Sequence, residues 1–259
     1  MKCYVKHNTT KKRGYKKKIR LVKNTPEDNL NAVPTEIQVN AIINSVKKNY
    51  LFYIMLIVCI CIINKLSYKS PNIVLSLITI VPISLFGYAV HYVSHKMKDK
   101  FSKEYLSYDN IFTRNRVCNI IFTYIIRVAE FHHAVHHDTS INKKFTNILL
   151  EIRNNILLQG VIIIIFKKLL NLMDDKIILL WALFYSTVHN INFNITHPIT
   201  HAEHHVNNKT NYGIDIWDIL IGSKYDWTHI ENHNDTIINL IVITFVIIRI
   251  SNYFKCDYL

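Results

Sequence analysis

Apolar residues come in blocks along this chain, and the first two blocks predict a pair of membrane helices. The run at 50–66, YLFYIMLIVCICIINKL, has no charged residue before Lys65. At about 1.5 Å per residue, a helix of this length nearly spans a hydrocarbon core of about 30 Å. A polar turn with Pro71 follows, and a second apolar run begins near Asn72 and continues into the sequence HYVSH at 91–95. The two runs therefore predict a helical hairpin.

Two later runs predict a second hairpin. They cover 155–173 and 176–191, and Lys167 and Lys168 interrupt the first of them. If this hairpin crosses the membrane, both lysines must extend to the far interface, so a shallow or partly re-entrant hairpin stays open as an alternative. A last run at 236–250, TIINLIVITFVIIRI, is short for a span. A buried β-rich or helical segment and an interfacial anchor stay open for it, and we favour a helix that lies on the membrane or packs on the cap described next.

The pattern as a whole predicts an all-α integral membrane protein. We expect about four membrane helices in two hairpins and a cytosolic, histidine-rich helical cap. Composition agrees, because half of the 259 residues are hydrophobic and only 19% are charged, which is more apolar than soluble domains usually are. The five cysteines show no paired spacing, which argues against a disulfide framework or a thiolate zinc site.

The formal net charge of +13 is concentrated at the N-terminus, where residues 1–23 carry ten lysines and arginines and no acidic residue. Four more lysines, the first of them Lys96, follow the second apolar run. Both places are expected on the cytosolic side of the membrane. We therefore divide the chain into a basic cytosolic arm at 1–49 and a membrane domain at 50–259. The arm is interpreted as a tail that sets orientation, and no nucleic-acid partner is expected.

Histidines supply the candidate chemistry. Eleven of the chain's fourteen histidines lie between His91 and His205, and nine of these fall in the clusters HYVSH, HHAVHH and HAEHH. His91 and His95 are four residues apart, which places them on one face of a helix that is just leaving the bilayer. Because transition metals bind several imidazole lone pairs at once, the clusters predict a metal centre at the membrane surface.

The middle cluster ends an amphipathic segment at 117–137. On a helix, His133, His136 and His137 share one face, whereas His132 is rotated away by about 100°. We therefore interpret His132 as a supporting or surface residue, with a role as a ligand left open.

Three other histidines fit the pattern less well. His197 is four residues from His201, but Pro198 separates them and argues against a continuous helix, so a ligand role for His197 stays open. His229 and His233 lie beyond the clusters and are expected at the surface.

The three clusters and the following sequence NYGIDIWDILIGS resemble the fatty acid hydroxylase superfamily, which includes sterol desaturases, sterol methyl oxidases and sphingolipid hydroxylases. The resemblance covers about 85–223. In that family a histidine before an asparagine often ends the last membrane helix, and His189 fits this place. The resemblance implies nine metal-binding histidines: His91, His95, His133, His136, His137, His189, His201, His204 and His205.

The resemblance also implies an activity. We expect an O2-dependent enzyme of an endoplasmic-reticulum-type membrane that hydroxylates or desaturates a fatty acyl, sterol or sphingolipid substrate with two iron ions. Spacing alone does not distinguish iron from zinc, since imidazole binds both. The sequence has no haem-binding module and no dinucleotide fingerprint, so a cytochrome b5-like or ferredoxin-like donor is expected to supply electrons.

Polar residues near the clusters are candidates for orienting the imidazoles by accepting their second N–H, and for each of them a solvated position or a helix cap stays open. The candidates are Glu130, Asp138, Glu203, Asp218, Asn211 and Tyr212, and Trp217 is expected to pack the cap over the site. Two other classes stay open. One is a non-catalytic membrane protein that binds metal or haem, although haem needs only one or two axial ligands. The other is a zinc hydrolase or transporter, which lacks support because no H-E-x-x-H motif occurs.

Overall fold

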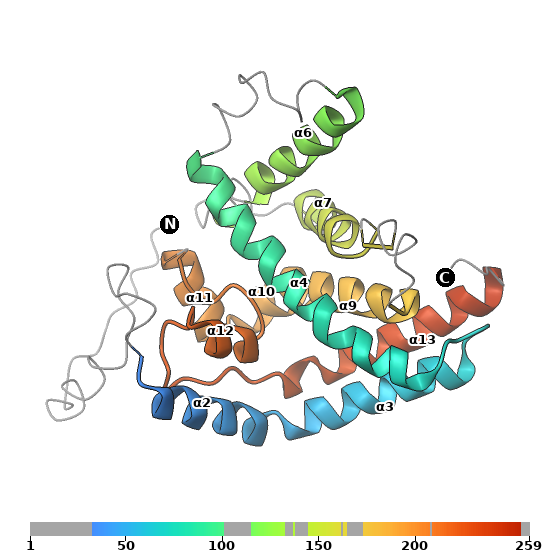
Figure 1. Cartoon of the computed structure of the whole chain (residues 1–259), viewed down its shortest axis with the longest axis horizontal. Coiled ribbons are helices and arrows are strands. Elements are labelled where there is room, and N and C mark those ends of the chain that lie inside the picture. The colour runs from blue at the N-terminus through green and yellow to red at the C-terminus, as the bar shows by residue number, and fades with distance from the viewer. Residues whose placement is uncertain are drawn as a thin grey trace, which may run out of the picture.

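The computed structural model describes residues 33–100, 115–132, 137, 145–161, 163–164, 173–207 and 209–254 (Figure 1). Within these ranges the chain forms helices and no β-strand, so the predicted all-α class is confirmed there. The α-helices are α2 (Thr35–Lys48), α3 (Tyr50–Leu66), α4 (Ile73–Lys100), α6 (Arg116–Phe131), α7 (Phe145–Ile156), α9 (Asp175–Thr187), α10 (Phe193–Thr196), α11 (Ile199–Val206), α12 (Asp215–Ile221) and α13 (Ile237–Phe254). Two π-helical turns, η3 (Leu157–Val161) and η4 (Val188–Asn192), and the 3₁₀ turn η5 (Asn234–Thr236) complete the set.

Helix α9 is the centre of the packing. It contacts α13, α7 and α4, and side chains all around it are buried, as expected for a helix that is apolar on every face. Among these buried side chains are Ile177, Leu180 and Trp181. Figure 1 shows α4 crossing α9, with α3 and α13 running side by side below them. The apolar core therefore lies where α3, α4, α9 and α13 meet.

The position of α13 decides among the alternatives for 236–250. The helix continues to Phe254 and packs against both α3 and α9, with Leu240 and Ile247 in the main core. The run is therefore a buried helical segment rather than the favoured helix on the membrane or on the cap. Arg249 is exposed near the end of the helix and does not interrupt the apolar part.

Length and composition indicate a membrane protein. In the part of the chain that the structure describes, two helical stretches are long and apolar enough to cross a membrane, Ile73–His95 and Asn234–Phe254. The count becomes three if α2 and α3, which meet at an angle of 64°, form one bent span. Along α4 the side chains of Val74, Ile78 and Val81 are more than half exposed at helical spacing, as expected for a face that contacts lipid.

Helix α4 carries the first histidine pair. As predicted, it begins just after Asn72 and continues without a break through His91 and His95, and Pro82 lies inside it. Gly87 allows a close approach, because a Cβ at this position would lie 2.7 Å from the Trp181 indole nitrogen of α9. The predicted first helix is also confirmed, since α3 covers 50–66.

Asn49 fixes the bend between α2 and α3. Its side chain is fully buried, donates to the main-chain carbonyl of Glu231 and accepts from the main-chain N–H of His233. On the other face of the bend, Ala41 of α2 packs with Ile219 of α12. These contacts hold α12 and the segment that precedes α13 against α2 and the bend that follows it.

Candidate metal centre

Histidines from four parts of the chain meet in one cluster. Seven of the nine predicted ligands are described, and all seven belong to it, together with His132. His133 and His136 lie outside the described residues. The ring centroids connect the cluster without a gap: 4.7 Å from His95 to both His137 and His204, 4.6 Å from His137 to His205, 4.5 Å from His205 to His201, 4.9 Å from His201 to His189, and 5.2 Å from His91 to His132.

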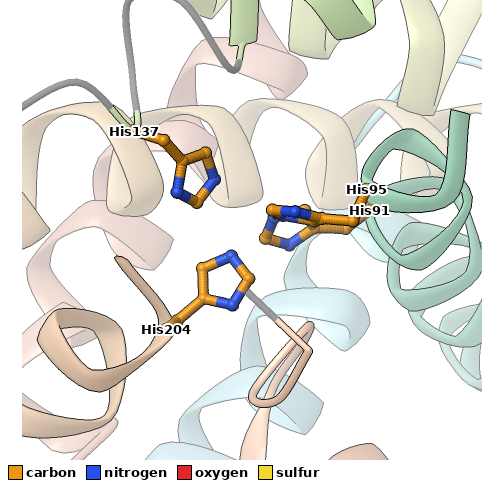
Figure 2. A group of neighbouring side chains, drawn as sticks. All are labelled: His91, His95, His137 and His204. Carbon is orange, nitrogen blue, oxygen red and sulfur yellow. The ribbon is translucent and has the colours of Figure 1, made fainter. Parts of the chain in front are cut away.

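Four of these rings form the tightest group. One nitrogen from each of His91, His95, His137 and His204 lies within 4.8 Å of the others. Figure 2 shows the four rings turned toward a common space, with the first two coming from α4 and the other two facing them. His204 is completely buried, and His91 and His95 are nearly so. This arrangement would bring at least three and up to four imidazole ligands to one ion.

The nitrogen spacing matches that of ligands on a shared ion. Two nitrogens bound about 2.0–2.1 Å from one metal, at bond angles near 90–110°, lie roughly 2.8–3.4 Å apart. The Nε2 atoms of His91 and His95 are 3.1 Å apart, those of His132 and His137 are 3.1 Å apart, and those of His201 and His205 are 2.9 Å apart. Neutral imidazoles at this spacing either share a proton or bind one ion.

Two main-chain carbonyls orient the ligand nitrogens. Nδ1 of His91 lies 2.7 Å from the Tyr212 carbonyl, and Nδ1 of His204 lies 2.5 Å from the Thr210 carbonyl. Because a carbonyl only accepts, Nδ1 carries the proton in both rings and Nε2 carries the lone pair. Ligating histidines typically donate their other N–H in this way, which fixes the tautomer and the ring orientation.

The N-Y-G sequence shapes the loop that provides these carbonyls. Asn211 has φ 56°, a left-handed conformation that asparagine adopts more readily than most residues. Its amide donates to the Thr200 carbonyl at the start of α11 and accepts from the N–H of Tyr225. Gly213 lies against α4, where a Cβ would be 3.0 Å from the Tyr88 ring. Each residue of the motif thus has a structural reason.

Asp218 holds the same loop from behind. Its Oδ1 accepts from the Tyr212 N–H at 2.8 Å and from the Ser223 hydroxyl at 2.6 Å, and its Oδ2 accepts from the Gly213 N–H at 2.9 Å. The Tyr88 hydroxyl donates to Ser223 and extends the network to α4. Burial raises the pKa of Asp218 to about 6, although the bonds from Ser223, Gly213 and Tyr212 and the nearby Lys224 lower it.

Asp218 therefore supports the imidazoles only indirectly. It does not accept a hydrogen bond from an imidazole, but it holds the loop whose carbonyls do. Residue type gave no signal for Thr210, because its main-chain oxygen is the functional atom. Asp138 and the side chain of Glu130 lie outside what the structure describes. Trp217 donates to Ser84 of α4 and so ties α12 to that helix.

His132 lies beside His91 and His137, whereas a regular α-helix would rotate it away from the other histidines. Helix α6 ends at Phe131, and the N–H of His137 bonds to the carbonyl of His132, which spans five residues rather than four. A turn of this width places residues i and i+5 on the same side, so His132 faces the cluster instead of pointing away. Burial and the neighbouring His91, His137, His189 and His95 lower the pKa of His132, which favours the neutral form that binds metal.

His189 reaches the cluster from a second π-type turn. It lies in η4, where α9 continues into α10, and it is buried. Its ring stacks on that of Tyr185 at 5.2 Å and meets that of His201 at 4.9 Å. The predicted place at the end of an apolar helix is therefore confirmed.

The three described histidines outside the cluster, His197, His229 and His233, differ in burial. His197 is exposed and has φ 46°, where it ends α10, and Pro198 begins α11, so the predicted helix break is present. His229 is half-buried. His233 is buried, which makes the prediction of a surface position wrong. The reason is Asn49, whose side chain accepts from the His233 N–H and draws this segment into the fold.

The donor set fits a transition metal or a pair of them. It consists of neutral imidazoles with lone pairs that converge, two of them oriented by carbonyls, as ligands of iron, zinc or copper are. Comparisons with protein-family models, with curated proteins and with solved structures find no match for this chain.

Proposed function

We propose that this chain is an O2-dependent membrane oxidoreductase that hydroxylates or desaturates a lipid at a histidine-bound di-iron centre. The observation that carries the proposal is the convergence of eight described histidines at the end of a helix long enough to span a membrane. Even a six-coordinate ion would leave some of them unused. Eight or more imidazoles offer three to five ligands to each of two ions and leave positions open for oxygen.

The histidines divide naturally between two ions. His91, His95 and His204 would hold one, with His137 between the two. His189, His201 and His205 would hold the other, together with His132 or with the pair His133 and His136. Iron, when bound, supplies the reductive activation of dioxygen that an unactivated C–H bond requires.

An apolar cavity beside the cluster supports a lipid substrate. The cavity has a volume of about 250 Å³, and its walls include Phe52, Leu56 and Ile80. Trp181 and Phe184 line both this cavity and a second, smaller one, whose walls include histidines of the cluster. A hydrocarbon chain in the larger cavity would therefore lie next to the metal centre, where apolar walls exclude water from the reacting carbon.

Topology and partners complete the proposal. We place the chain in an endoplasmic-reticulum-type membrane with about four membrane helices in two hairpins, and with the basic N-terminal arm and the histidine cap on the cytosolic side. A cytochrome b5-like or ferredoxin-like protein would deliver electrons there.

The test uses the purified full-length chain and cells that express it. Metal content is measured by mass spectrometry, and lipids from cells with and without the protein are profiled for products with one added oxygen or one added double bond. His204→Ala is expected to lose metal and to abolish the product. His197→Asn is the matched control, because this exposed left-handed position tolerates asparagine and lies outside the cluster.

Three results separate the alternatives. Loss of metal and product in His204→Ala, but not in His197→Asn, supports the proposal. Bound metal with no lipid product in any membrane supports a non-catalytic metal-binding protein instead. Retention of both metal and product in His204→Ala removes the cluster from the chemistry.

A further inference from the structure

The smaller cavity has a second polar wall that the metal centre does not use. Its lining includes His91, His189 and His201 of the cluster and, besides them, Glu231 and His233. Glu231 and His233 are 7% and 6% exposed. Among the described residues, neither Oε1 of Glu231 nor Nε2 of His233 has a hydrogen-bond partner. Buried polar atoms without partners are uncommon, and two on one cavity wall point to a ligand.

The main chain around this pair is held firmly. The Glu231 N–H donates to Asp215 at 2.6 Å, and the Glu231 carbonyl accepts from Asn49 at 2.9 Å. Asp215 also pairs with Lys224, and both are buried, so their charges neutralise each other. The Asn49 amide fixes the His233 N–H as well. The two side chains are therefore presented to the cavity by a rigid frame, as a binding site requires.

Both side chains are suited to a neutral ligand. Burial, and next the negative charge of Asp215, raise the pKa of Glu231 to about 8, so its carboxyl is largely protonated at neutral pH and donates a hydrogen bond. Burial lowers the pKa of His233, which keeps its imidazole uncharged. Together they offer a donor and an acceptor that bear no net charge.

The cavity is small and borders the apolar one. Its volume of about 50 Å³ admits a group of only a few heavy atoms. Trp181, Phe184 and Ile214 line both cavities, so a molecule with a hydrocarbon part in the larger cavity can place a polar end in the smaller one. The lining of the smaller cavity also includes the carboxylates of Asp215 and Asp218, which disfavour a free anion, and a large charged headgroup would not fit.

We propose that Glu231 and His233 bind the neutral polar group of the lipid substrate, a hydroxyl or an amide, beside the metal centre. This inference rests on the proposed function, because that function makes the bound lipid a substrate. The binding itself does not depend on turnover. Because the same small cavity contains the metal-side histidines, the polar group and the oxidised carbon lie within a few bonds of each other.

The test measures binding through tryptophan fluorescence. Bromine quenches indole at short range, and Trp181 lines both cavities. The full-length protein in detergent is titrated with 11-bromo-1-undecanol and, separately, with 1-bromoundecane, which lacks only the hydroxyl. The variants are Glu231→Leu, which removes the polar atoms at similar size, and Glu231→Gln, which keeps a donor and an acceptor. Trp181→Phe identifies the part of the quenching that arises at Trp181, since Trp217 also lines the larger cavity.

A lost hydrogen bond of ordinary strength weakens binding by about tenfold. We expect the bromoalcohol midpoint to rise about tenfold in Glu231→Leu and to change little in Glu231→Gln, while the bromoalkane midpoint stays the same in all three proteins. An unchanged bromoalcohol midpoint in Glu231→Leu overturns the inference. Equal weakening of both probes also overturns it, because Glu231 would then serve only the fold.

The outcome is independent of the oxidase assignment. If binding follows the expected pattern but no lipid product forms in cells, the polar site stands and the proposed oxidation fails. If lipid oxidation is found and the hydroxyl makes no difference to binding, the oxidase stands and this site fails.

Discussion

Asp218 is expected to control metal affinity without touching the metal. The perturbation is Asp218→Asn, which keeps the shape of the side chain but replaces one acceptor oxygen by an NH2 group. Asp218 accepts from the Tyr212 N–H, the Gly213 N–H and the Ser223 hydroxyl. Because both carboxylate oxygens are used by main-chain N–H groups, the new NH2 must face a donor whichever way the amide is turned.

The magnitude follows from these contacts. Asp218 is 1% exposed, so a main-chain donor that loses its acceptor cannot turn to water, and a loss of this kind costs about 1–3 kcal/mol. The strained loop carries the Tyr212 and Thr210 carbonyls that orient His91 and His204. Loss of such outer partners typically lowers metal affinity by about 10- to 100-fold.

The assay is a metal competition titration at pH 7.5, where Asp218 with a pKa of about 6 is ionised, paired with a thermal melt. Asp174→Asn is the matched control, since this buried carboxylate accepts from Ser76 and caps α9 at the end away from His189. We expect both variants to melt lower and only Asp218→Asn to lose metal affinity. Wild-type affinity in Asp218→Asn, with the melt lowered as in the control, would refute the coupling.

Three further predictions follow from single contacts. Gly213→Ala should lower metal content several-fold, because its Cβ would lie 3.0 Å from the Tyr88 ring and push the loop away from α4; metal analysis of the purified variant checks this. Chelation should lower the melting temperature of the wild type and leave that of His204→Ala unchanged, because only the wild type loses bound metal. Burial raises the pKa of Glu231 from 4.5 to about 8, so the folded chain keeps a proton that the unfolded chain releases in this window. Stability measured by denaturant titration should therefore fall from pH 5 to pH 8 in the wild type relative to Glu231→Gln.

The elements that hold the site were largely predictable, because each has a local signal. The apolar run at 50–66 coincides with α3, and the spacing of His91 and His95 predicted that both lie on one face of α4. Pro198 correctly predicted the break before α11. Hydrophobic pattern and helical spacing are properties of neighbouring residues, so one sequence is enough to read them.

What could not be predicted depends on main-chain geometry or on distant partners. The π-type turn that brings His132 inward is a one-residue change in hydrogen bonding, and a face drawn at 100° per residue misses it. The hydrogen bond at Thr210 is accepted by a main-chain carbonyl, which every residue type has, so the residue type gives no signal. The burial of His233 depends on Asn49, which is 184 residues away in the chain. No pattern among neighbouring residues predicts these three features.

The histidine cluster itself argues that metal binding and folding are coupled here. Burying an imidazole costs free energy unless its polar atoms are satisfied, and the cluster gathers eight described rings at one place. Two protons are accommodated by the carbonyls of Tyr212 and Thr210, and the other ring nitrogens of His91 and His204 lie close to those of His95 and His137. A cation at the centre would accept several of these lone pairs at once. Metal should therefore stabilise the packing of α4 against α11 and the N-Y-G loop, and the free energy of binding becomes free energy of folding. The same coupling explains why Asp218, which touches only the loop, is expected to change metal affinity.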